Sequence, residues 1–257
     1  MKEITLEERK QIQLRMLIEI DAFCRKHNIR YSLAYGTLIG AIRHKGFIPW
    51  DDDVDIMMPL PDMLRFKELF KSETMCYCDV DTDKRYKYAF SRIANTQTYN
   101  KNGLISTSYG ICIDLYPVLG LPLSIEGIEQ FFKKGEQELN RRLRIIRLVD
   151  LVKRFLPVTY VNGFNEAMKR YRDFLFQYPY ERTKYFFTNG GGLEMRNVHE
   201  FDLFEECTEV LFEGHKFMSI ARYDDYLRHF YGDYMQLPPE DKRVPYHGGH
   251  YYWKKEK

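Results

Sequence analysis

The sequence predicts an α+β protein in which a small mixed sheet is flanked by helices and interrupted by a helical insertion. Three observations support this fold class. Short apolar, strand-like runs alternate with helical periodicity over the first 120 or so residues. A long proline-free stretch after residue 124 has helical spacing, and a hairpin pattern and a last helix follow near the C-terminus. We therefore expect a core at 1–124, a helical insertion at 125–187, and a C-terminal hairpin and helix at 188–257 that complete the core domain.

The composition is that of a soluble globular protein. The 257 residues are 44% hydrophobic and 30% charged, and the formal net charge is +2. This charge gives no case for a nucleic-acid partner. The chain contains 20 tyrosines. Their flat rings suit sugars, bases or quaternary amines, although a tyrosine-rich core would explain them equally well.

Cysteine usage and the N-terminal region bear on location. Of five irregularly spaced cysteines only Cys76 and Cys78 are close, which is a weak metal signal, and a reduced cytoplasmic interior explains them best. The N-terminus is charged and lacks the apolar core of a signal peptide. No run reaches the roughly 18 apolar residues of a membrane span. We expect a cytoplasmic protein, either free or resting on the inner face of the plasma membrane.

The first element is an amphipathic helix over residues 5–27. Thr5 and Glu8 have the spacing of a capping box, and Asn28 can end the helix in a left-handed conformation. The apolar stripe consists of Ile12, Leu14, Met16, Leu17, Ile20, Phe23 and Cys24.

The core then alternates strands and helices. The expected elements are a strand at 29–34, a glycine turn and short helix at 35–44, a strand at 54–59, a helix at about 61–71, and strands at 87–93 and 109–118. Pro59 ends its strand, and Pro61 suits the first turn of the following helix.

The remaining elements follow the same logic. The long helix from residue 124 is followed by a helix over about 164–176 and by a loop at 188–194, which contains three glycines. Residues 209–220 predict a hairpin with Glu213-Gly214 at its turn, and 223–235 predict a last helix and turn.

The stretch "GFIPWDDDVDIMMP" (46–59) contains four carboxylates, those of Asp51, Asp52, Asp53 and Asp55. Strand side chains alternate between faces, so Asp53 and Asp55 would point the same way. Two such carboxylates are costly to ionise together, and a hard cation such as Mg²⁺ or Mn²⁺ removes that cost. Asp114, in another expected strand, is the natural third member. The alternative for the acidic run is a solvated loop.

Gly36 and Thr37 lie between a strand and a helix, where backbone N–H groups can bind phosphate; a plain turn is the alternative. The order strand, Gly-Thr, helix, D-x-D strand resembles the nucleotidyltransferase core. Arg43, His44 and Lys45 lie between these motifs. They are placed to meet anionic oxygens, or form a solvated basic helix end.

These motifs together resemble the LicD family, which includes phosphocholine transferases of bacterial surface glycans and is related to fukutin-type enzymes. The similar segments are "YGTLIGAIRHKGFIPWDDDVDIMMP", "CIDLYPV" and "YDDYLRHFYGDYMQLPPEDKR" with His247 after it. The resemblance implies a nucleotidyltransferase-like fold. It also implies metal-dependent transfer of a phospho-alcohol, commonly phosphocholine from CDP-choline, to a hydroxyl of a teichoic acid, lipopolysaccharide or capsule precursor, with release of CMP.

Carried over by position, Asp53 and Asp55 would bind the metal, and Asp114 would be the third metal carboxylate or the general base. Gly36 and Thr37 would hold donor phosphates. The other expected substrate-binding residues are Arg43, His44, Lys45, Trp50, Tyr231, Asp233, Tyr234 and His247. Arg43 and Lys45 would neutralise CMP, and the Tyr231 region would hold the head group. Trp50 could instead belong to the core and His247 could cap the tail. Asp51 and Asp52 would orient metal ligands or cap the loop.

Other functions stay open at this stage. A nucleotidyltransferase would attack the other phosphorus and release pyrophosphate, and a related transferase would move phosphoglycerol, phosphoethanolamine or phosphoribitol. A cation- or glycan-binding module with a degenerate site is disfavoured because all three aspartates are present. Residues 130–155 carry eight basic and three acidic side chains on an amphipathic helix. This helix would suit an anionic membrane and a lipid-linked acceptor, or simply pack on the core.

Overall fold

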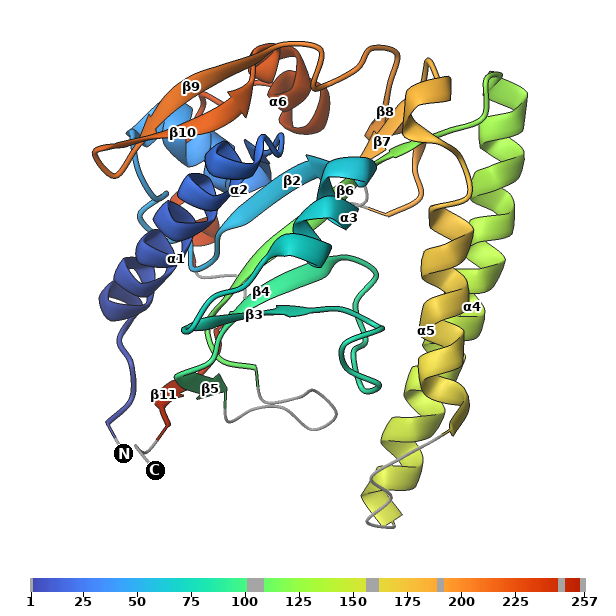
Figure 1. The fold of residues 1–257 in the computed structure, drawn as a ribbon, viewed down its shortest axis with the longest axis horizontal. Coiled ribbons are helices and arrows are strands. Elements are labelled where there is room, and N and C mark those ends of the chain that lie inside the picture. The colour runs from blue at the N-terminus through green and yellow to red at the C-terminus, as the bar shows by residue number, and fades with distance from the viewer. Residues whose placement is uncertain (1, 101–108, 156–161, 189–191, 245–247, 255–257) are drawn as a thin grey trace.

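The computed structural model describes residues 2–100, 109–155, 162–188, 192–244 and 248–254. A curled mixed sheet occupies the centre, with α1 on one side and the paired helices α4 and α5 on the other (Figure 1). Within the described residues, the predicted α+β class with a small mixed sheet is confirmed.

The sheet joins strands from distant parts of the sequence. The strand order along its main path is β1 (Ser32–Leu33), β2 (Asp55–Pro59), β6 (Cys112–Gly120), β4 (Ser91–Asn95) and β3 (Met75–Cys78). Outside this path, β7 (Phe186–Thr188) pairs with both β6 and β8 (Val198–His199). The pair β2 and β6 is parallel, whereas the other described pairs are antiparallel. This parallel pair brings two acidic segments of the chain side by side.

Helix α1 (Leu6–His27) forms as its sequence predicts. Thr5 and Glu8 make the reciprocal hydrogen bonds of a capping box, and Asn28 ends the helix with a φ of 51°. Leu17 and Ile20 on its apolar stripe are fully buried. Local capping and one apolar face therefore define both the ends and the orientation of this helix.

The short helix expected at 35–44 is confirmed, but the glycine turn expected before it is wrong. Helix α2 (Tyr35–Ile39) begins directly at Tyr35 and continues into a π-helical turn, η1 (Gly40–His44). Gly36 lies inside this helix. A Cβ atom at this position would lie 2.8 Å from the Asp51 Oδ2 atom, so a larger residue would crowd the acidic loop. Glycine is needed for close approach to a neighbouring segment, not for a turn.

The next elements lie where they were predicted, but strand boundaries differ by up to four residues; β6, for example, begins at Cys112, not at residue 109. Helix α3 (Leu60–Leu69) has Pro61 in its first turn. Strand β4 begins at Ser91, not at residue 87, because the preceding chain is held in turns. Asp79 contributes to these turns, since its Oδ1 accepts hydrogen bonds from the backbone N–H groups of Asp81 and Thr82 at 2.9 Å.

Two long neighbouring helices follow, α4 (Ile125–Phe155) and α5 (Asn162–Leu175), with Phe131 stacked on Phe174 at 4.7 Å between ring centroids. They lie where the sequence predicts a helical insertion. Of the expected loop at 188–194, Thr188 ends β7 and residues 189–191 lie outside the described residues. The second half of the chain also contains three short helical turns, η2 (Tyr180–Arg182) before β7, η3 (Met195–Asn197) after it and η4 (Glu240–Lys242) near the C-terminus. Within the described part of the chain, no helix combines the length and apolar character needed to cross a bilayer.

The C-terminal segment returns to the core. The predicted hairpin is confirmed as β9 (Cys207–Phe212) and β10 (His215–Ile220), with positive φ at Glu213 and Gly214. Helix α6 (Tyr223–Tyr231) then ends at Gly232. Two unpredicted strands, β5 (Thr98–Asn100) and β11 (Tyr251–Trp253), pair antiparallel, and Ile4 N–H donates to the Tyr251 carbonyl at 2.8 Å. Both ends of the chain therefore meet at one edge of the fold (Figure 1).

Candidate functional site

Two carboxylates lie next to each other where β2 and β6 pair. Asp55 opens β2 and is in register with Asp114 on β6. Asp55 N–H donates to the Thr37 Oγ1 atom at 2.9 Å, and Asp114 N–H donates to the Val54 carbonyl at the same distance. Both aspartates are buried, with 8% and 7% exposure. The sheet and the helix α2 thus fix two acidic side chains at close quarters.

The preceding loop adds further negative charge. Side-chain oxygens of Asp51, Asp52 and Asp53 all lie within 4.8 Å of one another. Burial, together with the charge of Asp53, raises the pKa of Asp51 to about 7. Burial also raises the pKa of Asp55 well above its ordinary value, with further contributions from Asp53 and Asp114. The fold therefore concentrates carboxylates that repel one another.

The donor set fits a hard divalent cation. The Asp55 Oδ1 atom is buried and has no hydrogen-bond partner among the described residues. A buried carboxylate oxygen without a donor is costly, and a bound cation would remove that cost. The neighbouring donors are all carboxylate oxygens, the ligands that Mg²⁺ and Mn²⁺ prefer. Asp51, Asp52 and Asp53 already offer oxygens close enough together for one ion; a site built from Asp53, Asp55 and Asp114 stays a prediction.

Asp51 and Asp52 differ in their surroundings. Asp52 is 2% exposed and forms an ion pair with Arg9 of α1 at 2.9 Å. It also accepts a hydrogen bond from Gly248 N–H at 3.2 Å. Asp52 therefore ties the acidic loop to both ends of the chain. Asp51 instead lies against Gly36 and couples electrostatically to Asp53.

An arginine accompanies Asp114. Arg92 lies opposite Asp114 in the pairing of β4 with β6. Its guanidinium approaches the carboxylate at 2.7 Å and 2.9 Å through two different nitrogens. The same guanidinium stacks over the Tyr88 ring at 3.9 Å from the centroid. Such a two-point contact fixes orientation as well as charge.

These groups line one cavity of about 160 Å³. Its walls combine acidic, basic and aromatic side chains with one thiol: Arg9, Asp53, Tyr88, Arg92, Asn100, Tyr109, Gly110, Cys112, Asp114 and Tyr251. Two of the three predicted metal-binding aspartates therefore face the same space, and the third, Asp55, is the strand neighbour of Asp114.

The structure places the predicted phosphate-binding pair beside the carboxylates. The Thr37 hydroxyl accepts the hydrogen bond that fixes the start of β2, and Gly36 provides room for Asp51. Both residues support the acidic site by direct contact. Their role toward a donor phosphate stays a prediction.

The basic segment points elsewhere. Arg43 donates to the carbonyls of Tyr234 at 2.6 Å and Gln236 at 3.3 Å, and to the His44 ring at 2.9 Å. Lys45 adopts a φ of 59° and its carbonyl accepts from Glu213 N–H. These contacts join residues 43–45 to the C-terminal hairpin and tail. None of them brings Arg43 or Lys45 to the carboxylates.

The aromatic candidates divide in the same way. Trp50 is half-buried between the His44 ring at 6.4 Å and the Arg243 guanidinium at 5.7 Å. The Tyr234 hydroxyl donates to Asp224 at 2.7 Å, away from the acidic loop. Tyr231 is 46% exposed, yet its hydroxyl is desolvated and lies within range of the charges of Asp55, Asp51 and Asp53, and both effects raise its pKa.

The roles of the two remaining candidates stay predictions. Asp233 is exposed, and His247 lies outside the described residues.

The sequence reasoning missed Arg9, Arg92 and Tyr88. The sequence did contain a signal for Arg9. It lies three residues before Ile12, on the buried stripe of α1, where a charged side chain needs a partner. The sequence contained no such signal for Arg92, because only the register between β4 and β6 places it opposite Asp114.

Comparison with known proteins agrees with this geometry. Residues 28–125 match the family model described as LicD/FKTN/FKRP, nucleotidyltransferase domain. The chain is 31% identical to the lipopolysaccharide cholinephosphotransferase LicD of Haemophilus influenzae, and the alignment covers 96% of this chain and 97% of that protein. An uncharacterised protein of Rickettsia typhi is 38% identical over 69 residues, 26% of this chain and 22% of its own. On the strength of the end-to-end alignment, the chain belongs to the LicD family.

Proposed function

We propose that this protein transfers phosphocholine from CDP-choline to a hydroxyl group of a cell-surface glycan precursor and releases CMP. The observation that carries the proposal is the buried Asp55–Asp114 pair beside Asp53, with an unpartnered oxygen on Asp55. The similarity along 96% of the chain to a protein named as a lipopolysaccharide cholinephosphotransferase supports the choice of substrate.

The carboxylates would act by position and charge. A Mg²⁺ or Mn²⁺ ion held by Asp53, Asp55 and Asp114 would supply positive charge to the donor phosphates. Asp53 is the better candidate for accepting the proton of the attacking hydroxyl, because Arg92 stabilises the ionised form of Asp114. Phosphoryl transfer demands little covalent chemistry from a protein, so positioning of these groups is the main requirement.

The same cavity already places cations on aromatic faces, since the Arg92 guanidinium lies over Tyr88 at 3.9 Å and that of Arg9 over Tyr251 at 4.5 Å. We propose that the quaternary ammonium group of choline uses this aromatic and acidic lining in the same way. Tyr88, Tyr109 and Tyr251 line the space that Asp53 and Asp114 share. A methylated cation gains from aromatic faces and nearby carboxylates, whereas glycerol or ribitol would not need them. This cavity replaces the Tyr231–Tyr234 region as the preferred place for the head group, with Tyr231 alone near the acidic loop.

The first test incubates the protein with CDP-choline, CDP-ethanolamine, CDP-glycerol or CDP-ribitol and a glycan acceptor, in Mg²⁺ or Mn²⁺. We expect CMP release to be fastest with CDP-choline and to stop in excess EDTA. Undiminished turnover in EDTA would overturn the metal assignment. Release of pyrophosphate from CTP, without CMP from any CDP-alcohol, would instead identify a nucleotidyltransferase.

The acceptor carrier is a separate part of the proposal. We propose that α4 brings the protein to an anionic membrane that carries a lipid-linked glycan. Lys133, Lys134, Arg141 and Arg144 are exposed on the described part of this helix, while Phe131 and Phe132 are buried against the rest of the fold. One basic face is therefore available for anionic head groups.

A further inference from the structure

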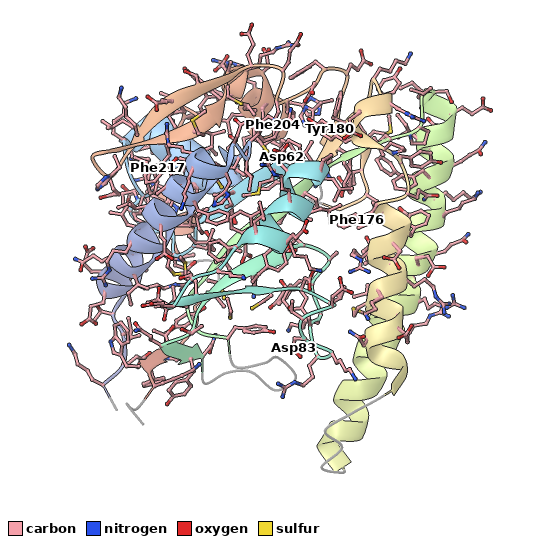
Figure 2. The ribbon with its side chains drawn as sticks, in the orientation of Figure 1. Asp62, Asp83, Phe176, Tyr180, Phe204 and Phe217 are labelled. Carbon is pink, nitrogen blue, oxygen red and sulfur yellow. The ribbon has the colours of Figure 1, made fainter. Side chains whose placement is uncertain are left out.

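A second cavity, of about 270 Å³, lies between α3, the chain leading into β4, and the end of α5. Tyr77, Tyr88, Phe90 and Phe176 give it aromatic walls. Phe176 directly follows α5 and lies on the side of that helix that faces α3 (Figure 2). The cavity therefore joins the sheet to the helical insertion, and the candidate site described above does not include it.

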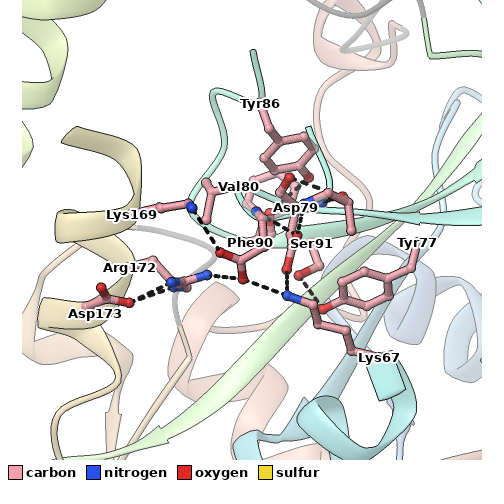
Figure 3. A network of polar contacts seen from close by, with 12 residues as sticks. Lys67, Tyr77, Asp79, Val80, Tyr86, Phe90, Ser91, Lys169, Arg172 and Asp173 are labelled. Carbon is pink, nitrogen blue, oxygen red and sulfur yellow. Dashed lines mark hydrogen bonds and ion pairs between the residues drawn. The ribbon is translucent and has the colours of Figure 1, made fainter. Parts of the chain in front are cut away.

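The charged side chains along this cavity form ion pairs with one another. Lys67 of α3 contacts Asp79 at 2.5 Å and Asp81 at 2.7 Å, and Arg172 of α5 contacts Asp81 at 2.5 Å (Figure 3). Arg172 also pairs with Asp173 at 2.7 Å. Because each of these cations already faces a carboxylate, the cavity offers hydrogen-bond donors and acceptors without a strong field of either sign.

This combination suits a neutral, hydroxyl-rich ring. The C–H face of a sugar can pack on an aromatic ring, while its hydroxyls bond to carboxylates and guanidinium groups. The volume of about 270 Å³ equals the liquid volume of roughly nine waters, which is room for one sugar ring. A phosphate would meet the carboxylates of Asp79, Asp81 and Asp173 and would leave the aromatic walls unused.

The second cavity adjoins the candidate site through one side chain. Tyr88 lines both cavities. On one side, the Tyr88 ring holds the Arg92 guanidinium that pairs with Asp114. Next to it, the Phe90 ring contacts Tyr116 at 4.5 Å, two residues after Asp114 on β6. A ring bound in the second cavity would thus lie one aromatic side chain away from the carboxylates.

We propose that the second cavity is a saccharide subsite that holds a sugar ring of the acceptor glycan. The inference deepens the proposed function and rests on it for the word acceptor, but sugar binding itself can be tested separately. The probes are the methyl β-glycosides of glucose, galactose, N-acetylglucosamine and N-acetylgalactosamine. Saturation-transfer difference NMR reports their binding to the full-length protein, and the sugar with the strongest signal then serves as acceptor with CDP-choline.

Phe176→Ala is the test variant, because Phe176 lines this cavity and not the one with Asp53 and Asp114. We expect at least a threefold loss of NMR signal and at least a threefold higher acceptor KM, with an unchanged KM for CDP-choline. Phe176→Trp keeps an aromatic wall and should retain both properties. Phe174→Ala is the matched control, because Phe174 stacks on Phe131 of α4 instead of facing the cavity. It controls for loss of helix packing.

The outcomes separate the two proposals. Equal sugar signals in the wild type and Phe176→Ala would overturn the subsite, as would equal losses in Phe176→Ala and Phe174→Ala. Phosphocholine transfer in the wild type would then still support the proposed function. A Phe176-dependent sugar signal without any transfer from CDP-choline would keep the saccharide subsite and overturn the proposed function.

Discussion

Asp55 carries an electrostatic cost that an uncharged side chain of the same shape would remove. Its carboxylate is buried, lies near those of Asp53 and Asp114, and has one oxygen without a hydrogen-bond donor among the described residues. We predict that Asp55→Asn abolishes transfer and raises the metal-free Tm by about 2–4 °C, equivalent to roughly 1 kcal/mol. Differential scanning fluorimetry and CMP release measure the two effects.

Asp241→Asn is the control for that variant, because Asp241 is exposed on η4 and does not line the cavity with Asp53 and Asp114. It should change neither quantity. Retained transfer in Asp55→Asn would contradict the role assigned to this aspartate.

His199 on β8 predicts a pH effect outside the candidate site. Burial, with a smaller contribution from the nearby His229, lowers its pKa from 6.5 to about 3. The unfolded chain therefore binds a proton at a pH where folded His199 stays neutral. The stability that neutral His199 permits is fully present above pH 6.5 and is lost as the pH falls from 6.5 toward 3.

We predict that the free energy of unfolding of the wild type falls between about pH 7 and pH 5.5 by roughly 1.4 kcal/mol more than that of His199→Phe. Phenylalanine does not titrate, and the neighbouring rings of Phe201, Tyr226 and Phe230 can pack against it. Urea unfolding at both pH values measures the difference. His215→Gln, an exposed change on β10, should follow the wild type; parallel curves for His199→Phe would refute the prediction.

At the scale of elements, α4 is the part of the insertion that would meet a membrane. Replacing Lys133, Lys134, Arg141 and Arg144 with glutamine should reduce flotation with anionic liposomes at low salt, because each exposed cation contributes about 1 kcal/mol near an anionic surface. Neutral liposomes should bind neither protein. Flotation that is absent in the wild type at low salt would discard the membrane contact.

Elements with strong local signals were predictable from the sequence. The capping box at Thr5 and Glu8 and the turn at Glu213-Gly214 each involve residues close in sequence, and both are confirmed. Strand β3 and the pairing of β5 with β11 were missed, because their stability comes from partners elsewhere in the chain. The division at residue 124, next to the start of α4, stays a prediction.

The candidate site was predictable from the sequence only in part. Alternation in two strands predicted that Asp53, Asp55 and Asp114 could meet, and β2–β6 pairing does bring Asp55 next to Asp114. The positions of Arg9 and Arg92 depend on how α1 and β4 pack, which no short motif encodes. The Arg43 segment was misleading, because a basic helix end can bind backbone carbonyls as readily as phosphate.

At the scale of the whole molecule, the acidic site should make stability depend on divalent cations. An ion that binds the folded state alone stabilises it by about 2.7 kcal/mol at 100 times its Kd. We predict that the Tm of the wild type rises with Mn²⁺ or Mg²⁺, and that the rise is largely lost in Asp53→Asn. A Tm that is independent of both ions at millimolar concentration would contradict the predicted metal site.

The contact of Asp52 with both ends of the chain has a consequence for synthesis on the ribosome. Asp52 pairs with Arg9 and accepts from Gly248, and Tyr251 closes the cavity over Asp114. At about 5–20 residues per second, the acidic loop leaves the ribosome many seconds before the residues that complete its surroundings. The nascent core must carry its clustered aspartates through that interval, so the site matures only when translation of the last strand is finished.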